Sequence, residues 1–312
     1  MNGAAIVTKD LVKRYGRARA LDGFSLTVPT RSVMGLVGCN GAGKTTWMMT
    51  VAGFVRPQSG TVNVLGEGPF DATRHGGRLA ILPQDSELPS EVCPAELLMR
   101  YARLQGLSAT EAERTAKALI ASFNLGPHAR KKIRALSHGM RKRVMVAQAF
   151  IGDPAIVLLD EPLSGLDPLE ADRMRAFIRA RRGRQTIVIL SHNLDDLEKL
   201  CTHVALIERG RLARVETLSA LTAAPGRVVY RLRRRPDTLQ ALEQREAGFS
   251  LQWCDQTGEL AVEVAAAVPP EEINARWLPD LLPFGVVSVS AGRSLEEAYL
   301  AGAQARFKEF AD

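Results

Sequence analysis

Short apolar runs alternate with stretches of helical spacing along the first two thirds of the chain. Three runs are short, uninterrupted and rich in branched residues, which predicts strands buried on both faces of a sheet. They are residues 32–37 (SVMGLV), 155–161 (AIVLLDE) and 186–190 (TIVIL). Helical spacing follows the first run to about Ala52 and recurs at 95–105 and 109–123. This alternation predicts an α/β fold with a largely parallel sheet.

The last third of the chain has a different pattern. It predicts strands at 227–234, 249–254, 259–265 and 284–290, and helices at 236–246, 269–280 and 294–308. The order β-α-β-β-α-β with an extra terminal helix is typical of a ferredoxin-like α+β unit. The Pro225-Gly226 turn separates the two patterns, so we expect two domains, 1–222 and 227–312.

Composition narrows the class of protein. Hydrophobic residues make up 46% and charged residues 24%, as in soluble globular proteins. Even the most apolar region, residues 144–159, is broken by Asp153, so the chain is not expected to cross a bilayer. Its first residues lack the features of a secretory signal, and its four cysteines lack metal-ligand spacing. We therefore expect a cytoplasmic protein with reduced thiols.

Charge divides the chain at the same place. The net charge is +7, but residues 1–220 hold 31 basic and 21 acidic side chains, against 10 and 13 in residues 221–312. Such asymmetry suggests two bodies with different partners, although a charge excess is more often a solvated surface than a binding site.

A phosphate-binding pattern follows the first strand. Gly38 and Gly43, five positions apart, precede Lys44 and Thr45 between a predicted strand and a predicted helix. Converging backbone N–H groups at a helix N-terminus can hold triphosphate oxygens, and glycines let the backbone approach them closely. Lys44 would neutralise the β- and γ-phosphates, and the Thr45 hydroxyl would bind Mg²⁺. The candidate nucleotide-binding residues of this loop are Gly38, Asn40, Gly41, Ala42, Gly43, Lys44, Thr45 and Thr46.

Polar residues follow the other predicted core strands. Asp160 and Glu161 lie at the carboxyl end of a strand, which is where open parallel sheets bind ligands. Asp160 suits Mg²⁺ binding, whereas Glu161 is placed to orient or deprotonate a water that attacks the γ-phosphate. Alone, the pair is equally consistent with a surface turn; beside a phosphate loop, the functional interpretation is favoured.

Gln84 and His192 occupy similar positions after apolar runs. A neutral amide can accept a hydrogen bond from water and contact Mg²⁺, and a histidine just beyond a strand can reach the same crevice. A lone histidine is more often structural, and Gln84 by itself would carry no assignment.

Together these motifs resemble those of the ATP-binding cassette (ABC) ATPases, the nucleotide-binding subunits of ABC transporters. Residues 136–140 (LSHGM) are similar to the signature sequence of that family and lie between Gln84 and Asp160, in the family's order. The resemblance covers about residues 4–220. It implies that Tyr15 stacks on adenine and that residues 164–167 (SGLD) form the D-loop.

The same resemblance assigns roles to the polar residues. It implies that Gln84 is the Q-loop residue and His192 the switch histidine. The expected catalytic residues are Glu161, His192 and Gln84, and the expected Mg²⁺ ligands are Thr45, Gln84 and Asp160.

The resemblance also implies an assembly. ATP would be sandwiched in a head-to-tail dimer, in which the phosphate loop of one subunit faces Ser137 and Gly139 of the other. The second subunit would be another copy or a related ATPase. A helical subdomain at about 88–150 would contact a separate transmembrane permease, and an antiparallel part (residues 4–29 and 61–65) would present Tyr15 to the base. The chain would then lie at the cytoplasmic face of the membrane and touch the membrane through the permease.

Three residues depart from the usual family pattern. His138 and Met140 replace the Gly and Gln of the common signature, a form similar to exporter-type bacterial cassettes, and this favours export. Cys39 replaces a proline or small residue in the phosphate loop. Packing is its expected role, but a thiol beside a helix N-terminus can be reactive, so we predict that alkylation at Cys39 blocks hydrolysis and that ATP protects it.

Basic residues surround the signature. We interpret most of them as a solvated helix face with transient contacts to anionic lipid headgroups. They are Arg130, Lys131, Lys132, Arg134, Arg141, Lys142 and Arg143.

Two classes of function remain open at this point. The favoured one is an ATPase that drives a membrane transporter, with no nucleic-acid partner. The other is a soluble cassette ATPase that acts on nucleic acid or ribosomes, but the chain has one cassette, no long heptad repeats and no strongly basic tail. A small-molecule kinase is disfavoured because Glu161 equips the site to use water. The C-terminal domain is expected to extend the dimer contact, with a regulatory ligand site as the alternative.

Overall fold

The computed structural model describes residues 3–224, 226–237, 239, 242, 248–264 and 268–299. The chain divides into two compact units, Met1–Thr217 and Leu218–Asp312. Among the described residues, no helix has both the length and the apolar character needed to span a bilayer.

A six-stranded sheet forms the centre of the first unit. Its strand order is β5-β6-β7-β3-β8-β9; β5 to β8 are parallel and β9 is antiparallel to β8. Every residue of β3, β6 and β7 is buried, as their uninterrupted apolar runs predict. The strands are β3 (Val33–Val37), β5 (Leu79–Leu82), β6 (Ile156–Asp160), β7 (Thr186–Leu190), β8 (His203–Glu208) and β9 (Arg211–Thr217).

The register of this sheet aligns the ends of three strands. Leu190 of β7 pairs with Asp160 of β6 on one side and with Leu36 of β3 on the other. The residues that follow β3, β6 and β7 therefore emerge at one edge of the sheet.

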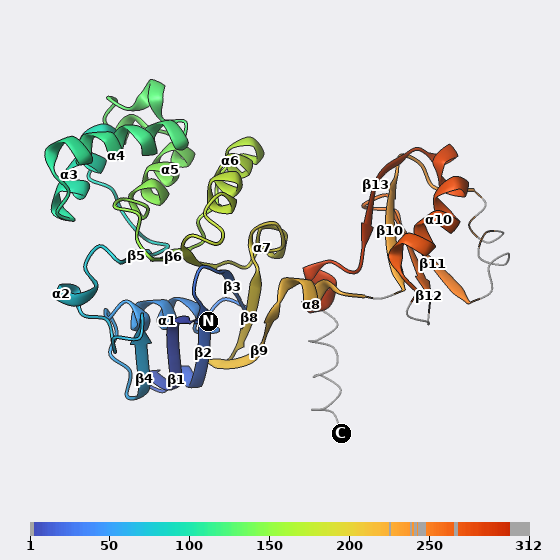
Figure 1. Cartoon of the computed structure of the whole chain (residues 1–312), viewed down its shortest axis with the longest axis horizontal. Helices are drawn as coiled ribbons and strands as arrows, with labels where there is room; N and C mark the ends of the chain where they lie inside the picture. Colours follow the sequence, from blue (N-terminus) through green and yellow to red (C-terminus); the bar gives the residue numbers. More distant parts are fainter. Residues whose placement is uncertain are drawn as a thin grey trace. The chain divides into compact units, whose positions relative to one another are not determined.

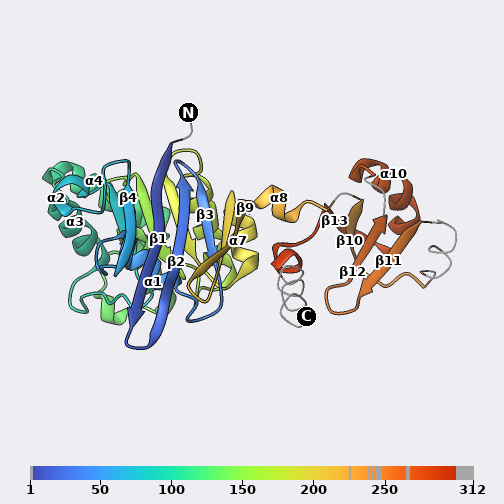
Figure 2. The same cartoon turned by 90° about the horizontal axis from the view of Figure 1, so that it is seen from below.

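A second sheet in this unit is antiparallel, with the order β2-β1-β4 (Figure 2). Helix α1 (Lys44–Val51) packs with both sheets in one continuous core, where the Trp47 ring lies 6.3 Å from that of Phe24. The Trp47 indole also donates to the Thr8 hydroxyl at 3.3 Å. The strands are β1 (Ala4–Tyr15), β2 (Ala18–Pro29) and β4 (Ser59–Val64).

Three helices gather into a cluster beyond β5 (Figure 1). They are α3 (Pro94–Leu104), α4 (Ala109–Ser122) and α5 (His138–Gln148), the first two within one residue of the predicted bounds. A capping box between Ser108 and Glu111 begins α4. The remaining helices of the unit are α2 (Ala72–His75), α6 (Pro168–Arg179) and α7 (Leu194–Leu200), with 3₁₀ turns at Gly126–His128 and Ile133–Ala135.

The second unit contains a four-stranded antiparallel sheet with the order β11-β12-β10-β13. The first and third strands of the unit are central, which is the ferredoxin-like order. Tyr230 and Trp277 are the largest fully buried side chains of its core. The elements are α8 (Leu218–Thr222), β10 (Arg227–Leu232), β11 (Phe249–Cys254), β12 (Glu259–Val264), α10 (Pro270–Leu281), a 3₁₀ turn (Leu282–Phe284) and β13 (Val286–Ala291).

Two predicted helices of this unit fall largely outside the described residues. Residues 295–299 of the predicted helix 294–308 are helical, and the rest of that helix is not described. Most of the predicted helix 236–246 also lies outside the described residues.

Candidate functional site

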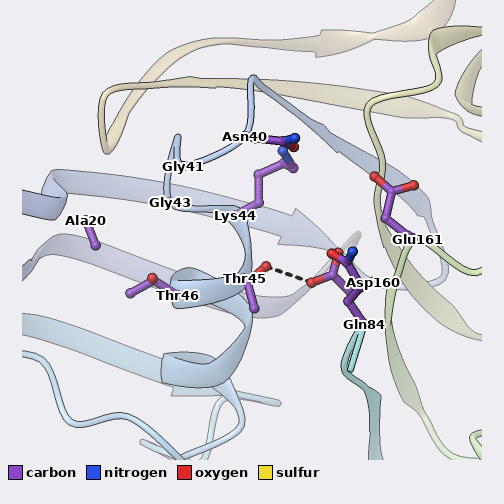
Figure 3. A pocket seen from close by; sticks show the side chains of 10 residues that line it. All are labelled: Ala20, Asn40, Gly41, Gly43, Lys44, Thr45, Thr46, Gln84, Asp160 and Glu161. Carbon is purple, nitrogen blue, oxygen red and sulfur yellow. Dashed lines mark hydrogen bonds between the residues drawn. The ribbon is translucent and has the colours of Figure 1, made fainter. Parts of the chain in front are cut away.

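A cavity of about 370 Å³ opens where β3 and β6 end (Figure 3). Four separate segments line it: strand β2, the loop that begins α1, the residues after β5 and the end of β6. Apart from Ala20, every lining residue was predicted from the sequence as a site residue. The lining consists of Ala20, Asn40, Gly41, Gly43, Lys44, Thr45, Thr46, Gln84, Asp160 and Glu161.

Two glycines of the loop are required by close packing. A Cβ atom at Gly43, whose φ is +110°, would lie 2.2 Å from the Ala20 carbonyl oxygen. A Cβ atom at Gly38 would lie 2.4 Å from the Ile207 carbonyl oxygen. Side chains at these positions would push the loop off β2 and β8, so the glycines fix the loop where α1 begins.

The Lys44 ammonium is held over this loop. Its Nζ donates to the carbonyl oxygens of Gly38 at 2.6 Å and Cys39 at 3.2 Å, and the residue is buried. Both acceptors are neutral, so these bonds position the ammonium without cancelling its charge. A buried cation among backbone N–H groups at a helix N-terminus provides an anion site.

The Thr45 hydroxyl donates to Asp160 Oδ2 at 2.7 Å, which joins the start of α1 to the end of β6 (Figure 3). Gln84 lines the same cavity. Burial raises the pKa of the Asp160 carboxyl above its ordinary value, and the Thr45 hydrogen bond opposes the shift. A carboxylate in this environment is stabilised by a cation, because burial penalises its uncompensated charge.

These three side chains fit Mg²⁺, which prefers oxygen ligands and commonly uses one or two carboxylates together with phosphate oxygens and water. Among the described residues, no group of three or more His, Cys, Asp or Glu side chains is arranged to hold a metal ion. A metal held by Thr45 and Asp160 would therefore take its remaining ligands from nucleotide and water.

Glu161 is fixed by the segment that follows β7. Its Oε1 accepts from the backbone N–H of His192 at 3.0 Å and lies 2.6 Å from His192 Nδ1, and its Oε2 accepts from the Ser191 hydroxyl at 3.1 Å. The backbone of Glu161 has φ +49°, an uncommon conformation for a residue with a side chain. The carboxylate thus lies on the cavity wall in a defined orientation.

The other predicted residues lie outside the cavity lining. Tyr15 is exposed at the β1–β2 turn, with the Lys13 ammonium 5.2 Å from its ring centroid. Gly38 and Ala42 belong to the loop but do not line the cavity. Ser137 caps α5 by accepting from the Met140 N–H at 3.2 Å, and the Gly139 position lies near Leu166 of the D-loop.

Most of the basic residues around the signature are exposed, as expected, and two are exceptions. Lys142 and Arg143 are only 5% and 7% exposed, although the charge pattern resembled an exposed face. Burial lowers the pKa of the Lys142 ammonium, and the charges of Glu161 and Asp160 oppose this shift. The turn of α5 directs these two side chains inward, which a run of like charges does not reveal.

The sequence did not identify Ser191 or Ala20 as site residues. Ser191 directly precedes His192, so its place after a core strand was an available signal, but its bond to Glu161 depends on the pairing of β6 with β7. Ala20 carries no chemical signal and lines the cavity through its position on β2.

Comparison with protein families matches residues 21–164 to the family described as ABC transporter. The chain is 32% identical over 304 residues to the daunorubicin/doxorubicin resistance ATP-binding protein of Streptomyces peucetius, which covers 95% of this chain and 92% of that protein. It is also 35% identical over 210 residues to a Nod factor export ATP-binding protein of Burkholderia lata, covering 67% of this chain and 69% of the relative.

Solved structures give the same relationship. The structure described as the ATP-binding subunit of an ABC transporter superposes with a TM-score of 0.63 at 26% identity, covering 70% of this chain and 91% of that one. The ADP conformation of an ATP-binding cassette superposes with a TM-score of 0.59 at 22% identity, covering 69% of this chain and 91% of that one; this second likeness concerns the fold alone.

Proposed function

Because the chain belongs to the ABC transporter family, whose ATPase domains hydrolyse ATP, we propose that it binds Mg-ATP in the cavity at the ends of β3 and β6 and drives a separate membrane permease. The observation that carries the proposal is the convergence of Lys44, Thr45 and Asp160 on one cavity, within reach of Glu161. The names of two relatives refer to export or drug resistance, so we propose export as the direction of transport.

Nucleotide binding would use the phosphate loop. The N-terminus of α1 and the Lys44 ammonium provide positive charge for the β- and γ-phosphates. Thr45, Asp160 and Gln84 would hold Mg²⁺, which supplies neutralisation of the phosphate oxygens when it is bound. Tyr15 would contribute the adenine contact from the exposed β1–β2 turn.

Hydrolysis would use Glu161 as the group that orients and deprotonates the attacking water. Its two oxygens already accept from the Ser191 hydroxyl and the His192 N–H, so the carboxylate needs little reorganisation. His192 is two-thirds exposed, and its ring lies against the same carboxylate oxygen. It would act as the switch that responds to the γ-phosphate, and Gln84 would complete the catalytic set.

A second chain would complete the site. Ser137 is exposed at the start of α5 and does not line this chain's cavity. The N-terminus of an eleven-residue helix, with Ser137 and Gly139 at its tip, suits the γ-phosphate of a nucleotide on another subunit. This arrangement supports a head-to-tail dimer, formed with another copy or with a related ATPase.

An open groove of about 360 Å³ supports the permease contact. It lies between β5 and the helical cluster, beside the strand that leads to Gln84. Leu104 on its wall is 81% exposed, and Met99 of the same helix is also exposed. Exposed apolar side chains around a groove are typical of protein interaction sites, and we propose that a cytoplasmic segment of the permease binds here. The lining is Gly77, Leu79, Ala80, Ile81, Tyr101, Leu104, Gln105, Gln148 and Ala149.

The nucleotide part of the proposal is tested by ATP binding and phosphate release with purified protein. We expect Mg-dependent hydrolysis, and we expect Lys44→Ala to weaken nucleotide binding by at least roughly tenfold, because a buried cation facing the phosphates is lost. An exposed lysine on α4, changed as Lys117→Ala, serves as the control. Protein that takes up no ATP, with or without membranes, would overturn the proposal.

The permease part is tested by affinity purification from native membranes followed by mass spectrometry. A polytopic membrane protein should be recovered with the wild-type chain and lost with Leu104→Glu, while ATP binding is retained. Phe54→Glu, which alters another exposed apolar residue, is the matched control. Recovery of RNA or ribosomal proteins in a salt-sensitive complex, without a membrane protein, would contradict the transport assignment.

A further inference from the structure

Three helices of the first unit meet at one buried ion pair. Arg143 on α5 and Glu170 on α6 place Nη1 and Oε2 3.0 Å apart, and their side chains are only 8% and 14% exposed. The same Arg143 nitrogen donates to the carbonyl oxygens of Phe123 at 2.9 Å and Asn124 at 3.0 Å, at the end of α4. The side-chain amide of Asn124 in turn donates to Glu170 Oε1 at 3.3 Å.

The ion pair lies next to the two loops that the proposed dimer requires. The backbone N–H of Glu170 donates to Asp167 Oδ1 at 2.9 Å, so Glu170 belongs to the first turn that the D-loop residue Asp167 caps. A Cβ atom at Gly165 would lie 3.3 Å from the His138 ring, and one at Gly139 would lie 3.6 Å from Leu166. The start of α5 and the D-loop of one chain are therefore in direct contact.

We propose that Glu170 is a positioning residue for ATP hydrolysis, because its ion pair with Arg143 fixes the loop after Glu161 against the helix that begins at Ser137. The inference rests on the proposed function. Glu161 would act on the nucleotide of its own chain and Ser137 on that of the partner. Because the spacing between Glu161 and Ser137 is fixed, the geometry of one ATP site would depend on whether ATP is bound at the other.

The ion pair's role in positioning can be separated from its effect on stability. Removing one member of a buried ion pair leaves an uncompensated charge and destabilises the fold, whereas replacing both members by apolar residues of similar size is often neutral. The double variant Arg143→Met/Glu170→Leu should therefore be more stable than either single variant, but less stable than the wild type, because the carbonyl oxygens of Phe123 and Asn124 lose the Arg143 donor. It should not regain the defined placement of the D-loop, because packing of two flexible apolar chains does not reproduce a charged pair with fixed partners.

The experiment measures thermal unfolding, nucleotide affinity, kcat and the Hill coefficient for ATP in the wild type, Glu170→Gln and the double variant. We expect the double variant to unfold at a higher temperature than Glu170→Gln and to bind nucleotide with wild-type affinity. Its kcat should fall roughly 10- to 100-fold, because small displacements of catalytic groups are costly, and its Hill coefficient should approach one. Glu170→Gln should also lower kcat, but by less than the double variant.

Hydrogen exchange gives a readout that is independent of activity. In the double variant we expect faster exchange in residues 162–167, with unchanged exchange in β3 and β7. Arg173→Ala is the control. It removes a more exposed contact to the same carboxylate and leaves the pair with Arg143 in place, so exchange in residues 162–167 should stay as in the wild type. A double variant with wild-type kcat, or with unchanged exchange in residues 162–167, overturns the proposal. Failure of the wild type to bind or hydrolyse ATP would instead count against the proposed function.

Discussion

Glu161 Oε1 lies 2.6 Å from His192 Nδ1 and also accepts the backbone N–H of His192 at 3.0 Å. The carboxylate is thus bound to the segment after β7 by both the side chain and the main chain of one residue. Mutation can separate the main-chain and side-chain contributions of His192 to holding the Glu161 carboxylate, because a substitution at position 192 removes only the ring.

Glu161→Gln should retain nucleotide binding and slow hydrolysis by roughly 10²- to 10⁴-fold, because an amide cannot accept the proton of the attacking water. With ATP bound but not cleaved, the variant should accumulate as a closed dimer. Single-turnover phosphate release and analytical ultracentrifugation with ATP measure the two effects.

The control for this variant is Asp195→Asn, which removes an exposed carboxylate on α7. It should match the wild type in both assays. Normal turnover by Glu161→Gln would show that Glu161 is not the group that activates water.

His192→Ala should slow hydrolysis with little change in ATP affinity. The loss should be smaller than for Glu161→Gln, because the backbone N–H at position 192 and the Ser191 hydroxyl still hold the carboxylate. Steady-state kcat and equilibrium binding of a fluorescent ATP analogue give the comparison. Near-normal turnover would count against a switch role for His192.

The sequence indicated that these polar residues lie close together, because they come at or just after the ends of apolar strands. The run 155–161 ends in Asp160 and Glu161, and 186–190 is followed by His192, so a parallel sheet necessarily brings them to one edge. Strand periodicity does not give the register in which neighbouring strands pair. The bond from Ser191 to Glu161 depends on the pairing of β6 with β7, and that pairing is a tertiary property.

Burial of charge was the feature that the sequence predicted least well. Lys142 and Arg143 lie in a run of basic residues, which suggested a solvated face. In the structure Arg143 is buried against Glu170, a residue 27 positions away in the chain. Local pattern gives no indication of a partner at such separation, so it could not identify the two buried members of a run that is otherwise exposed.

The cysteines provide a chemical test of the nucleotide site. Cys39 is exposed in the phosphate loop, and Cys201 is buried, with the pKa of its thiol raised by that burial. Iodoacetamide should therefore inactivate the ATPase through Cys39 and leave Cys201 unmodified in the folded protein. ATP should slow the inactivation, because bound phosphates cover the loop.

Peptide mass spectrometry after alkylation assigns the modified positions. Cys254 is the internal control: it is exposed, and hydrogen bonds from Thr257 lower the pKa of its thiol, so it should react with or without ATP. The prediction is contradicted if Cys39→Ala retains the wild-type sensitivity to iodoacetamide.

The core of the second unit contains a buried tyrosine hydroxyl. Tyr230 is fully buried, and its hydroxyl forms no hydrogen bond with any described residue. An unsatisfied buried hydroxyl opposes folding, so Tyr230→Phe should leave the free energy of unfolding unchanged or raise it by about 1 kcal/mol at neutral pH. Hydrogen exchange in peptides from β10 and α10 reports the local stability of this unit.

The burial of Tyr230 also determines how the free energy of unfolding changes with pH. Burial raises the pKa of Tyr230 from 10.0 to about 12, so the folded chain keeps the phenolic proton in a range where the unfolded chain has lost it. Ionisation of this group therefore costs no stability below pH 10, and the free energy of unfolding falls as the pH rises from there towards 12. Tyr230→Phe should be less sensitive than the wild type over this range, whereas Tyr101→Phe, which alters a partly exposed tyrosine of the first unit, should follow the wild type. Equal loss of protection in the wild type and in Tyr230→Phe would show that the hydroxyl has a partner or reaches water.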